Sequence, residues 1–173
     1  MNVIDRNFSY GVFAVIPPPR RLAAIWARAF AALGRSGCSP DATLVFTPKP
    51  VVQMMSDALE AQNPGIFSDP DRTFADLFST AGLFLMELVR RLDKGLADAI
   101  PDQDERLRHI LTRQVFEMSH NAILHDNTLE AVSGGVPERR AWLVDSGHFQ
   151  VGNLAHMTSE ERDKTIAEML GDS

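Results

Sequence analysis

The stretch FADLFSTAGLFLME, residues 74–87, decides the fold because it leads from an apolar strand through a short turn into a helix. The segment 73–78 is short and apolar and follows the turn-forming residues 68–71. This pattern predicts a core strand. Apolar residues then recur at helical spacing over 82–96, which predicts a helix with one buried face. A strand that delivers the acidic Asp76 before a turn and a helix N-terminus is typical of a ligand site.

The segments on either side predict an alternation of helices and strands. Residues 8–16 predict a strand or extended arm, and three prolines at 17–19 force an extended backbone before the next helix. We predict helices over 20–33, 48–59, 101–113 and 159–170, strands over 114–118 and 141–144, and a helix or loop over 122–130. Thr158 and Glu161 form a capping box for the last helix. This order favours an α/β domain with a mainly parallel sheet.

The length of 173 residues favours one domain with one core. Residues 35–42 are rich in Ser, Gly and Pro, and we expect the boundary between an N-terminal arm with a helix, residues 1–40, and a domain over 41–173 in this loop. With 45% hydrophobic and 23% charged residues, the composition is that of a folded globular protein.

The charge and the cysteine content limit the partners and the compartment. A formal net charge of -6 argues against a surface that grips a phosphate backbone along its whole length, so contact with DNA is expected to be local or supplied by a partner. Cys38 is the only cysteine and cannot form an internal disulfide, which points to a reducing cytoplasm. The apolar run of residues 12–16 is too short to span a membrane, and we expect a soluble protein.

Two segments together resemble amino-group DNA methyltransferases of the N6-adenine type. Phe46-Thr47-Pro48, followed by a short spacer and an apolar helix, resembles the sequence that opens many of these enzymes. Alone this segment has a plain alternative interpretation, because Thr-Pro starts many helices. Physically it predicts a helix whose free N–H groups can face an anionic group such as a carboxylate.

The second segment resembles the cofactor motif of the same family, Asp-Pro-x-Cys-Gly-Ser-Gly-x-Phe-Leu with a Glu shortly after. The matching positions are Asp76, Gly82, Phe84, Leu85 and Glu87. Ser79 and Thr80 stand where the family has its cysteine and its first glycine, so the motif is eroded. A residue with a Cβ makes close approach of the backbone to a ligand harder. The resemblance implies that this turn holds the methionine part of S-adenosylmethionine.

The likeness covers residues 44–129, and the part after the motif is similar to methylase segments of large restriction enzymes. It implies a partial Rossmann-like methyltransferase fold. The family usually has an acid after its second strand that binds the ribose hydroxyls, and Ser119 stands at that place. Glu117 and Asp126 are nearby acids that could substitute, although each is more typical of a solvated surface charge. The expected cofactor residues are Phe46, Thr47, Pro48, Asp76, Phe78, Gly82 and Ser119.

The catalytic motif of the family, Asn or Asp followed by Pro-Pro and an aromatic residue, is absent after the second predicted strand. The segment 153–156 lies at a suitable distance but has neither the prolines nor the aromatic residue. We therefore predict no catalytic residue in this chain, and no metal site, because its five histidines lack ligand spacing. Residues 145–148 contain hydrolase residue types but predict a turn.

Three functions remain open from the sequence. The first is the cofactor-binding part of a restriction-modification DNA adenine methyltransferase, truncated or dependent on a partner for its catalytic and DNA-recognition parts. The second is an inactive methyltransferase-like scaffold or interaction module. The third is a small α/β binding protein whose likeness at residues 76–87 is a coincidence.

Overall fold

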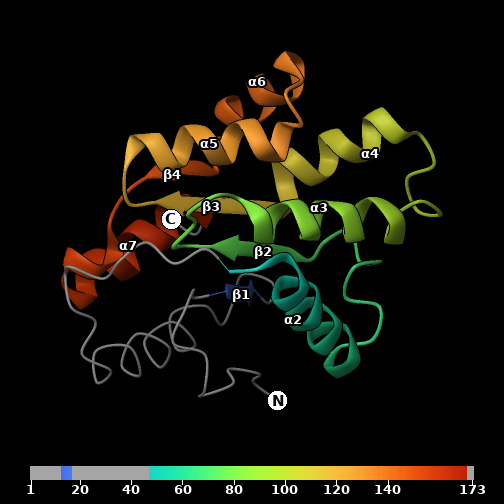
Figure 1. Ribbon diagram of the computed structural model, residues 1–173, viewed down its shortest axis with the longest axis horizontal. Coiled ribbons are helices and arrows are strands. Elements are labelled where there is room, and N and C mark those ends of the chain that lie inside the picture. Colours follow the sequence, from blue (N-terminus) through green and yellow to red (C-terminus); the bar gives the residue numbers. More distant parts are fainter. Residues whose placement is uncertain (1–12, 17–46, 171–173) are drawn as a thin grey trace.

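The computed structural model describes residues 13–16 and 47–170, which form a four-stranded sheet with helices around it (Figure 1). The sheet order is β1-β2-β3-β4, made of β1 (Phe13–Ile16), β2 (Thr73–Asp76), β3 (Val115–Ser119) and β4 (Phe149–Val151). Strands β2, β3 and β4 are parallel, whereas β1 pairs with β2 in the antiparallel direction. The predicted α/β class with a mainly parallel, partly Rossmann-like sheet is confirmed.

Six α-helices belong to the described part of the chain: α2 (Lys49–Gln62), α3 (Leu83–Gly95), α4 (Gln103–His109), α5 (Ala122–Ser133), α6 (Pro137–Ser146) and α7 (Ser159–Leu170). A π-helix, η1 (Ile110–Gln114), joins α4 directly to β3, and a short 3-10 turn, η2 (Leu154–His156), precedes α7. The predicted capping box of α7 is confirmed. The N–H and Oγ of Thr158 donate to Oε2 of Glu161, 2.7 and 2.8 Å away, and the Glu161 N–H donates back to Thr158 Oγ.

Alternating residues of the strands pack into two cores, one on each face of the sheet. Phe74 of β2 and Val115 of β3 face a core shared with α3, η1, α5 and α6. Ala75 and Phe116, the next residue of each strand, face a second core with Ile166 and other residues of α7. Figure 1 shows α3 and α5 on one side of the sheet and α7 on the other. This alternation follows from the two-residue period of a strand.

The parallel strands reproduce one half of a doubly wound sheet. Such sheets have the strand order 3-2-1-4-5-6, and in chain order β2, β3 and β4 take the places of strands 1, 2 and 3. Strand β1 occupies the place of strand 4, in the opposite direction. The carboxyl ends of the parallel strands β2 and β3, where such folds bind ligands, lie at the same end of the sheet.

The prediction of a third strand over 141–144 is wrong, because these residues belong to α6, and the third parallel strand is Phe149–Val151. Pro137 occupies the first helical turn, and Gly147, with φ of 72°, ends the helix, so two terminators enclose a ten-residue segment. Strand β4 has only three residues, too few for a clear alternation. The predicted helix over 20–33 and the boundary between 1–40 and 41–173 lie outside the described residues.

Close packing fixes the amino ends of β2 and β3. The Gln114 side chain is 1% exposed, and its Nε2 donates to the carbonyls of Asp69, 3.0 Å away, and Arg72, 2.9 Å away. At the end of α3, a Cβ added to Gly95 would lie 2.2 Å from the carbonyl oxygen of Phe67, so only glycine fits against this backbone. The end of the sheet opposite the candidate site is therefore tightly fixed.

Candidate cofactor-binding site

Three polar side chains of neighbouring strands lie on the same face, at the carboxyl end of the sheet. Asp76 is the register partner of Glu117 across the parallel β2–β3 pair, and Ser119 lies two residues beyond Glu117. Because Phe74 and Val115 of the same strands face α3 and α5, the two-residue period places Asp76, Glu117 and Ser119 on that side as well. The candidate site is thus a polar cluster between the strand ends and these helices.

The loop between β2 and α3 closes over the end of β3. The Phe78 N–H donates to Oδ1 of Asp76, 3.2 Å away, and the Ser79 N–H donates to the Met118 carbonyl, 3.1 Å away. Ser119 Oγ lies 3.1 Å from the Ser79 carbonyl oxygen and donates to it. The hydroxyls of Ser79 and Thr128 are also hydrogen bonded, at 3.1 Å. The predicted motif turn exists, and its polar groups are directed into the protein.

Gly82, the one motif glycine that the chain retains, serves the packing of two helices. It is the N-cap of α3 with φ of 66°, a left-handed conformation that a residue with a Cβ rarely adopts. A Cβ here would lie 3.2 Å from Cγ2 of Thr128 and 3.4 Å from Cγ2 of Val132. Glycine therefore lets the start of α3 approach α5 closely, the packing role that the third glycine has in dinucleotide-binding turns.

Glu117 is fully buried and bonded by both of its carboxyl oxygens. Its side chain is 0% exposed, its Oε1 contacts Ser119 Oγ, and its Oε2 lies 2.9 Å from Nδ1 of His125. A serine hydroxyl has one proton, and the Ser79 carbonyl can only accept. When Ser119 donates to Ser79, the bond between Ser119 and Glu117 therefore requires a proton on the Glu117 carboxyl.

The pKa values agree with this hydrogen count. Burial, with a smaller contribution from the charge of Asp76, raises the pKa of Glu117 to about 8, although a hydrogen bond that Ser119 donates to the ionised form of Glu117 opposes the shift. Burial also raises the pKa of Asp76 to about 6, against the lowering effect of the Phe78 N–H. Near neutral pH the pair thus consists of one ionised carboxylate, Asp76, and one protonated carboxyl, Glu117.

His125, near the start of α5, lies on the outer side of Glu117, with 18% of its side chain exposed. Burial lowers the pKa of His125, and the charge of Arg140 lowers it further. A neutral imidazole donates a hydrogen from only one nitrogen, and Nδ1 of His125 faces Oε2 of Glu117, so the two side chains share one proton across this contact. For the contact between Glu117 and Ser119, the sequence offered one signal. Residues i and i+2 of a strand point to the same face, so both side chains lie on the face that α3 and α5 cover.

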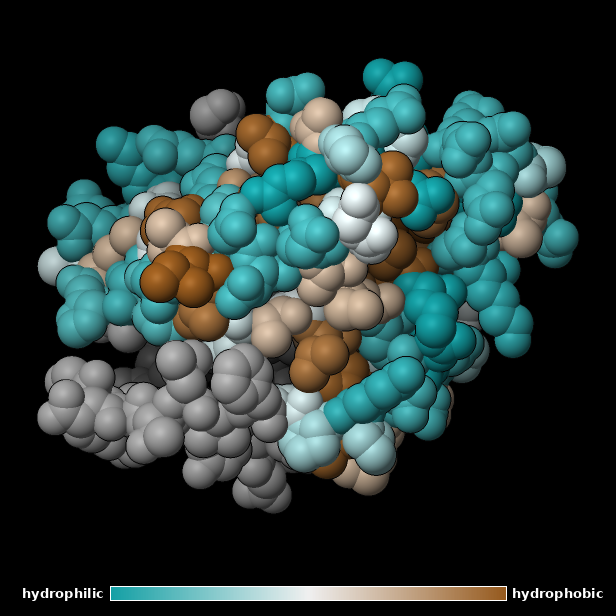
Figure 2. Space-filling view, turned by 45° about the horizontal axis from the view of Figure 1, so that its top comes forward, coloured by the Kyte–Doolittle hydropathy of each residue, from teal (hydrophilic) through white to brown (hydrophobic). Residues whose placement is uncertain are grey.

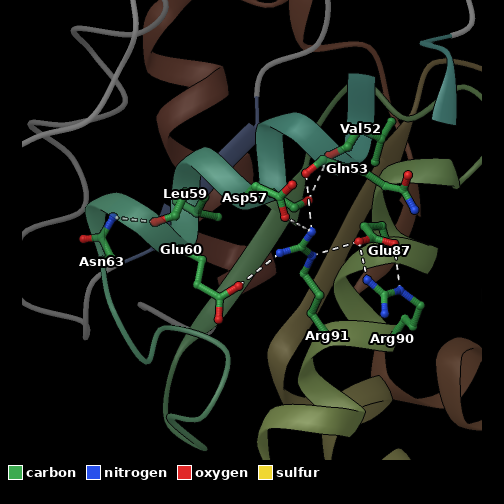
Figure 3. A network of polar contacts seen from close by, with 10 residues as sticks. Val52, Gln53, Asp57, Leu59, Glu60, Asn63, Glu87, Arg90 and Arg91 are labelled. Atoms are coloured by element: carbon green, nitrogen blue, oxygen red, sulfur yellow. Dashed lines mark hydrogen bonds and ion pairs between the residues drawn. The ribbon is translucent and has the colours of Figure 1, made fainter. Parts of the chain in front are cut away.

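An ion-pair network joins α2 to α3 (Figure 3). Glu87, the motif glutamate, is 6% exposed and accepts from Arg90 at 2.7 and 2.9 Å and from Arg91 at 2.8 Å. Arg91 also contacts Asp57 and, at 3.1 Å, Glu60, both on α2. These hydrogen bonds lower the pKa of Glu87 to about 2. Arg91 therefore joins α2, the helix that follows Thr47-Pro48, to α3, and the motif glutamate holds Arg91 from within α3.

The remaining predicted site residues have different surroundings. Pro48 is exposed and is the N-cap of α2, and its carbonyl accepts from the N–H groups of Val51 and Val52. Thr47 is half-buried, and no hydrogen bond joins Thr47 or Pro48 to Asp76 within residues 47–170. Phe78 is half-buried against the α7 core. Phe46 lies outside the described residues.

The surface over α3, α4 and α5 carries a groove that is separate from the strand-end cluster. Figure 2 shows hydrophobic residues interspersed with hydrophilic ones over the face that it presents. A shallow open groove is lined by Met86, Val89, Arg90, Asp93, Leu107, Ala131 and Val132, none of which belongs to the strand-end cluster. In the described part of the chain, no group of three or more His, Cys, Asp or Glu side chains could hold a metal ion. No helix among residues 47–170 has the length and apolar composition needed to cross a membrane.

The comparisons with known proteins point to one enzyme class. Over 74 residues, 43% of this chain, it is 38% identical to an adenine-specific methylase of Mycoplasma pneumoniae that is itself uncharacterized. The chain has a methyltransferase-like relative. The matched stretch spans 18% of that methylase's length. No protein-family model matches the chain, and no solved structure matches it.

The polar side chains at the strand ends fit the methionine end of S-adenosylmethionine better than they fit its ribose. Near neutral pH, Asp76 offers an ionised carboxylate at the end of β2, which suits the positively charged groups at the methionine end of the cofactor. At the ribose end, Ser119 donates to Ser79 and Glu117 has no exposed surface, so neither can bind two hydroxyls in this conformation. The fit is therefore partial and rests on Asp76.

Proposed function

We propose that the chain is the S-adenosylmethionine-binding part of a DNA adenine methyltransferase of a restriction-modification system. The observation that carries the proposal is Asp76 at the carboxyl end of β2, next to a turn and the start of α3, in a chain with a methylase relative. The relative's name also favours the methyltransferase interpretation over an unrelated binding protein.

In this proposal the chain binds the cofactor and does not perform the transfer. The bound cofactor supplies an electrophilic methyl group. The Asp76 carboxylate would face the cationic methionine end, and the loop of residues 77–82, hydrogen bonded to Asp76 and Ser119, borders the strand ends. The Asn-Pro-Pro-aromatic sequence that holds a flipped adenine must come from elsewhere, as must the basic surface that binds DNA, because the chain carries a net charge of -6.

A second candidate function is an inactive methyltransferase-like scaffold. It is favoured by the internal hydrogen bonds of Ser79 and Ser119, which occupy the groups that a ribose would need. In that case the polar cluster stabilises the sheet and binds no ligand. Asp76 is then a half-buried acid with a raised pKa and no partner outside the protein.

Isothermal titration calorimetry with S-adenosylmethionine separates the two candidates. The proposal predicts weak binding, in the high micromolar to millimolar range, and a loss of about tenfold or more in Asp76→Asn, because a charged hydrogen-bonding partner is removed. Asp98→Asn, an exposed acid in the turn after α3, is the control and should bind as the original chain does. No heat at millimolar cofactor, with a folded protein, would favour the scaffold.

A further inference from the structure

A chain of hydrogen bonds runs from α5 through β3 to the motif turn, residues 77–82. Nδ1 of His125 lies 2.9 Å from Oε2 of Glu117, and Oε1 of Glu117 contacts Ser119 Oγ. Ser119 Oγ in turn lies 3.1 Å from the carbonyl oxygen of Ser79. Glu117 and Ser119 are fully buried and Ser79 is almost so, which means that a bond lost from this chain is not replaced by one to solvent.

The number of protons decides which of these bonds exist at the same time. Ser119 has one hydroxyl proton and two neighbours that can accept it, the Glu117 carboxylate and the Ser79 carbonyl. With a proton on Oε1 of Glu117, the carboxyl donates to Ser119 and Ser119 donates to Ser79. Without that proton, Ser119 donates to the carboxylate, because a hydrogen bond to an ionised acceptor is about twice as strong as one between neutral groups. The Ser79 carbonyl then loses its donor.

The groups that face Glu117 from β2 and α5 favour its protonated form. Asp76 on β2 is its register partner, and burial together with that charge raises the pKa of Glu117 to about 8. On α5, burial and the charge of Arg140 lower the pKa of His125, whereas the charge of Asp126 raises it. Near neutral pH, neither strand β2 nor helix α5 therefore brings a positive charge to Glu117.

The other elements around Glu117 face it with neutral or paired groups. On β4, the backbone carbonyl of His148 accepts from the Glu117 N–H, 2.9 Å away, and the His148 ring stacks on Phe116. At the start of α3, the charges of Glu87 and Arg90 pair with each other, at 2.7 and 2.9 Å. The protonation of Glu117 thus depends on its burial, on Asp76 and on His125.

We propose that the proton on Glu117 controls how firmly the motif turn is held: with the carboxyl protonated, Ser119 binds the Ser79 carbonyl, and when the carboxyl ionises, Ser119 turns to Glu117 and releases that carbonyl. Ionised Asp76 strengthens the effect, because a second charge on Glu117 adds repulsion across the β2–β3 pair. The importance of this turn for a cofactor rests on the proposed function, whereas the Ser119–Ser79 bond is a property of the folded chain alone.

NMR of labelled carboxyl and carbonyl carbons tests the proposal, in the chain without cofactor, as the pH is raised from about 6 to about 10. The carboxyl carbon of Glu117 reports its ionisation, and the carbonyl carbon of Ser79 reports whether that oxygen accepts a hydrogen bond. We expect both signals to shift with one common midpoint. In Ser119→Ala the Glu117 signal should still titrate while the Ser79 signal stays constant, because the hydroxyl between them is gone.

Glu117→Gln is the second variant, and Glu130→Gln, an acid of α5 that is 64% exposed, is the matched control. Glutamine can donate to Ser119 as the protonated carboxyl does, so the Ser79 signal should show no step in Glu117→Gln and the original step in Glu130→Gln. A Ser79 step that persists in Ser119→Ala or Glu117→Gln overturns the proposal, as does a Glu117 titration without a Ser79 step in the original chain. Circular dichroism verifies that each variant is folded.

Amide hydrogen exchange measures how firmly the turn is held, at the Ser79 N–H, which donates to the Met118 carbonyl 3.1 Å away. At about pH 7, Ser119→Ala should lower the protection of this N–H by roughly fivefold to tenfold, the loss expected for one hydrogen bond. At about pH 9, where the original chain has also released the Ser79 carbonyl, the two proteins should differ little. An equal difference at both pH values overturns the proposal. Calorimetry with S-adenosylmethionine reports the proposed function separately.

Discussion

Asp76 and Glu117 are register partners on neighbouring parallel strands, and burial raises the pKa of both carboxyls, to about 6 and about 8. Adjacent strands lie about 4.8 Å apart, so two ionised carboxylates at this position would repel each other at short range. The pair therefore carries one proton near neutral pH.

Glu117→Gln should stabilise the protein at alkaline pH and have little effect at acid pH. A carboxyl whose pKa is raised by folding contributes stability below its unfolded pKa, near 4.5, and that contribution is lost as the pH rises through about 8. Glutamine resembles the protonated carboxyl and does not ionise. Thermal unfolding at about pH 5 and about pH 8.5 should show a higher Tm for the variant only at the higher pH. The same Tm difference at both pH values would contradict a buried, protonated Glu117.

The affinity for S-adenosylmethionine should fall as the pH is lowered from about 7 to about 5, because Asp76, with a pKa of about 6, loses its charge in this range. The cofactor's sulfonium keeps its charge throughout. Calorimetry at the two pH values should therefore show weaker binding at the lower one, and Asp76→Asn should remove the difference. A pH dependence that persists in Asp76→Asn would assign the effect to another group.

Gly82→Ala should destabilise the protein more than Gly134→Ala does. Both glycines have positive φ, 66° and 64°, but only a Cβ at position 82 meets other atoms, at 3.2 Å from Thr128. The shared cost of the left-handed conformation is about 1–2 kcal/mol, and the closer packing adds to it at Gly82. Urea unfolding of the two variants isolates the packing contribution. Equal losses would mean that α5 yields to the added methyl group.

Glu87→Gln should destabilise the protein near neutral pH by about 2 kcal/mol, because Arg91 loses its one buried carboxylate partner and keeps the exposed Asp57 and Glu60. The pKa of Glu87 is lowered to about 2, so its contribution is present above about pH 4.5 and is lost as the pH falls through about 2. Glu60→Gln is the control: Glu60 is 51% exposed and contacts the same arginine, and its loss should cost less than about 1 kcal/mol. Similar urea midpoints for both variants would contradict the assigned role of Glu87.

Much of the fold could be predicted from the sequence, because its apolar periodicity and its helix ends agree with the tertiary structure. The helices at 49–62 and 83–95 and the capped helix at 159–170 begin and end within about three residues of the predicted limits. The third strand could not be predicted. Residues 149–151 contain one buried side chain, Phe149, and a strand this short is specified by its neighbour β3 rather than by its own pattern.

The candidate site could be predicted in position but not in its contacts. The order of strand, turn and helix predicted that Asp76 and Ser119 follow one another at the carboxyl end of a parallel sheet. In the structure both residues lie at that end, on β2 and β3. Glu117 was interpreted as a surface charge, yet it is completely buried, because its partners His125 and Ser119 are brought to it by α5 and by the strand itself. A buried carboxyl needs hydrogen-bond partners, and the sequence pattern of one strand does not show which partners other elements bring to it.

The firm anchoring of Gln114 to the carbonyls of Asp69 and Arg72 lies at the amino end of the sheet, one strand length away from the motif turn. A substitution at Thr80 leaves these anchors in place, whereas Gly82 in the same turn is fixed by its packing against Thr128. The amino end of the sheet thus keeps its geometry independently of the residue at position 80.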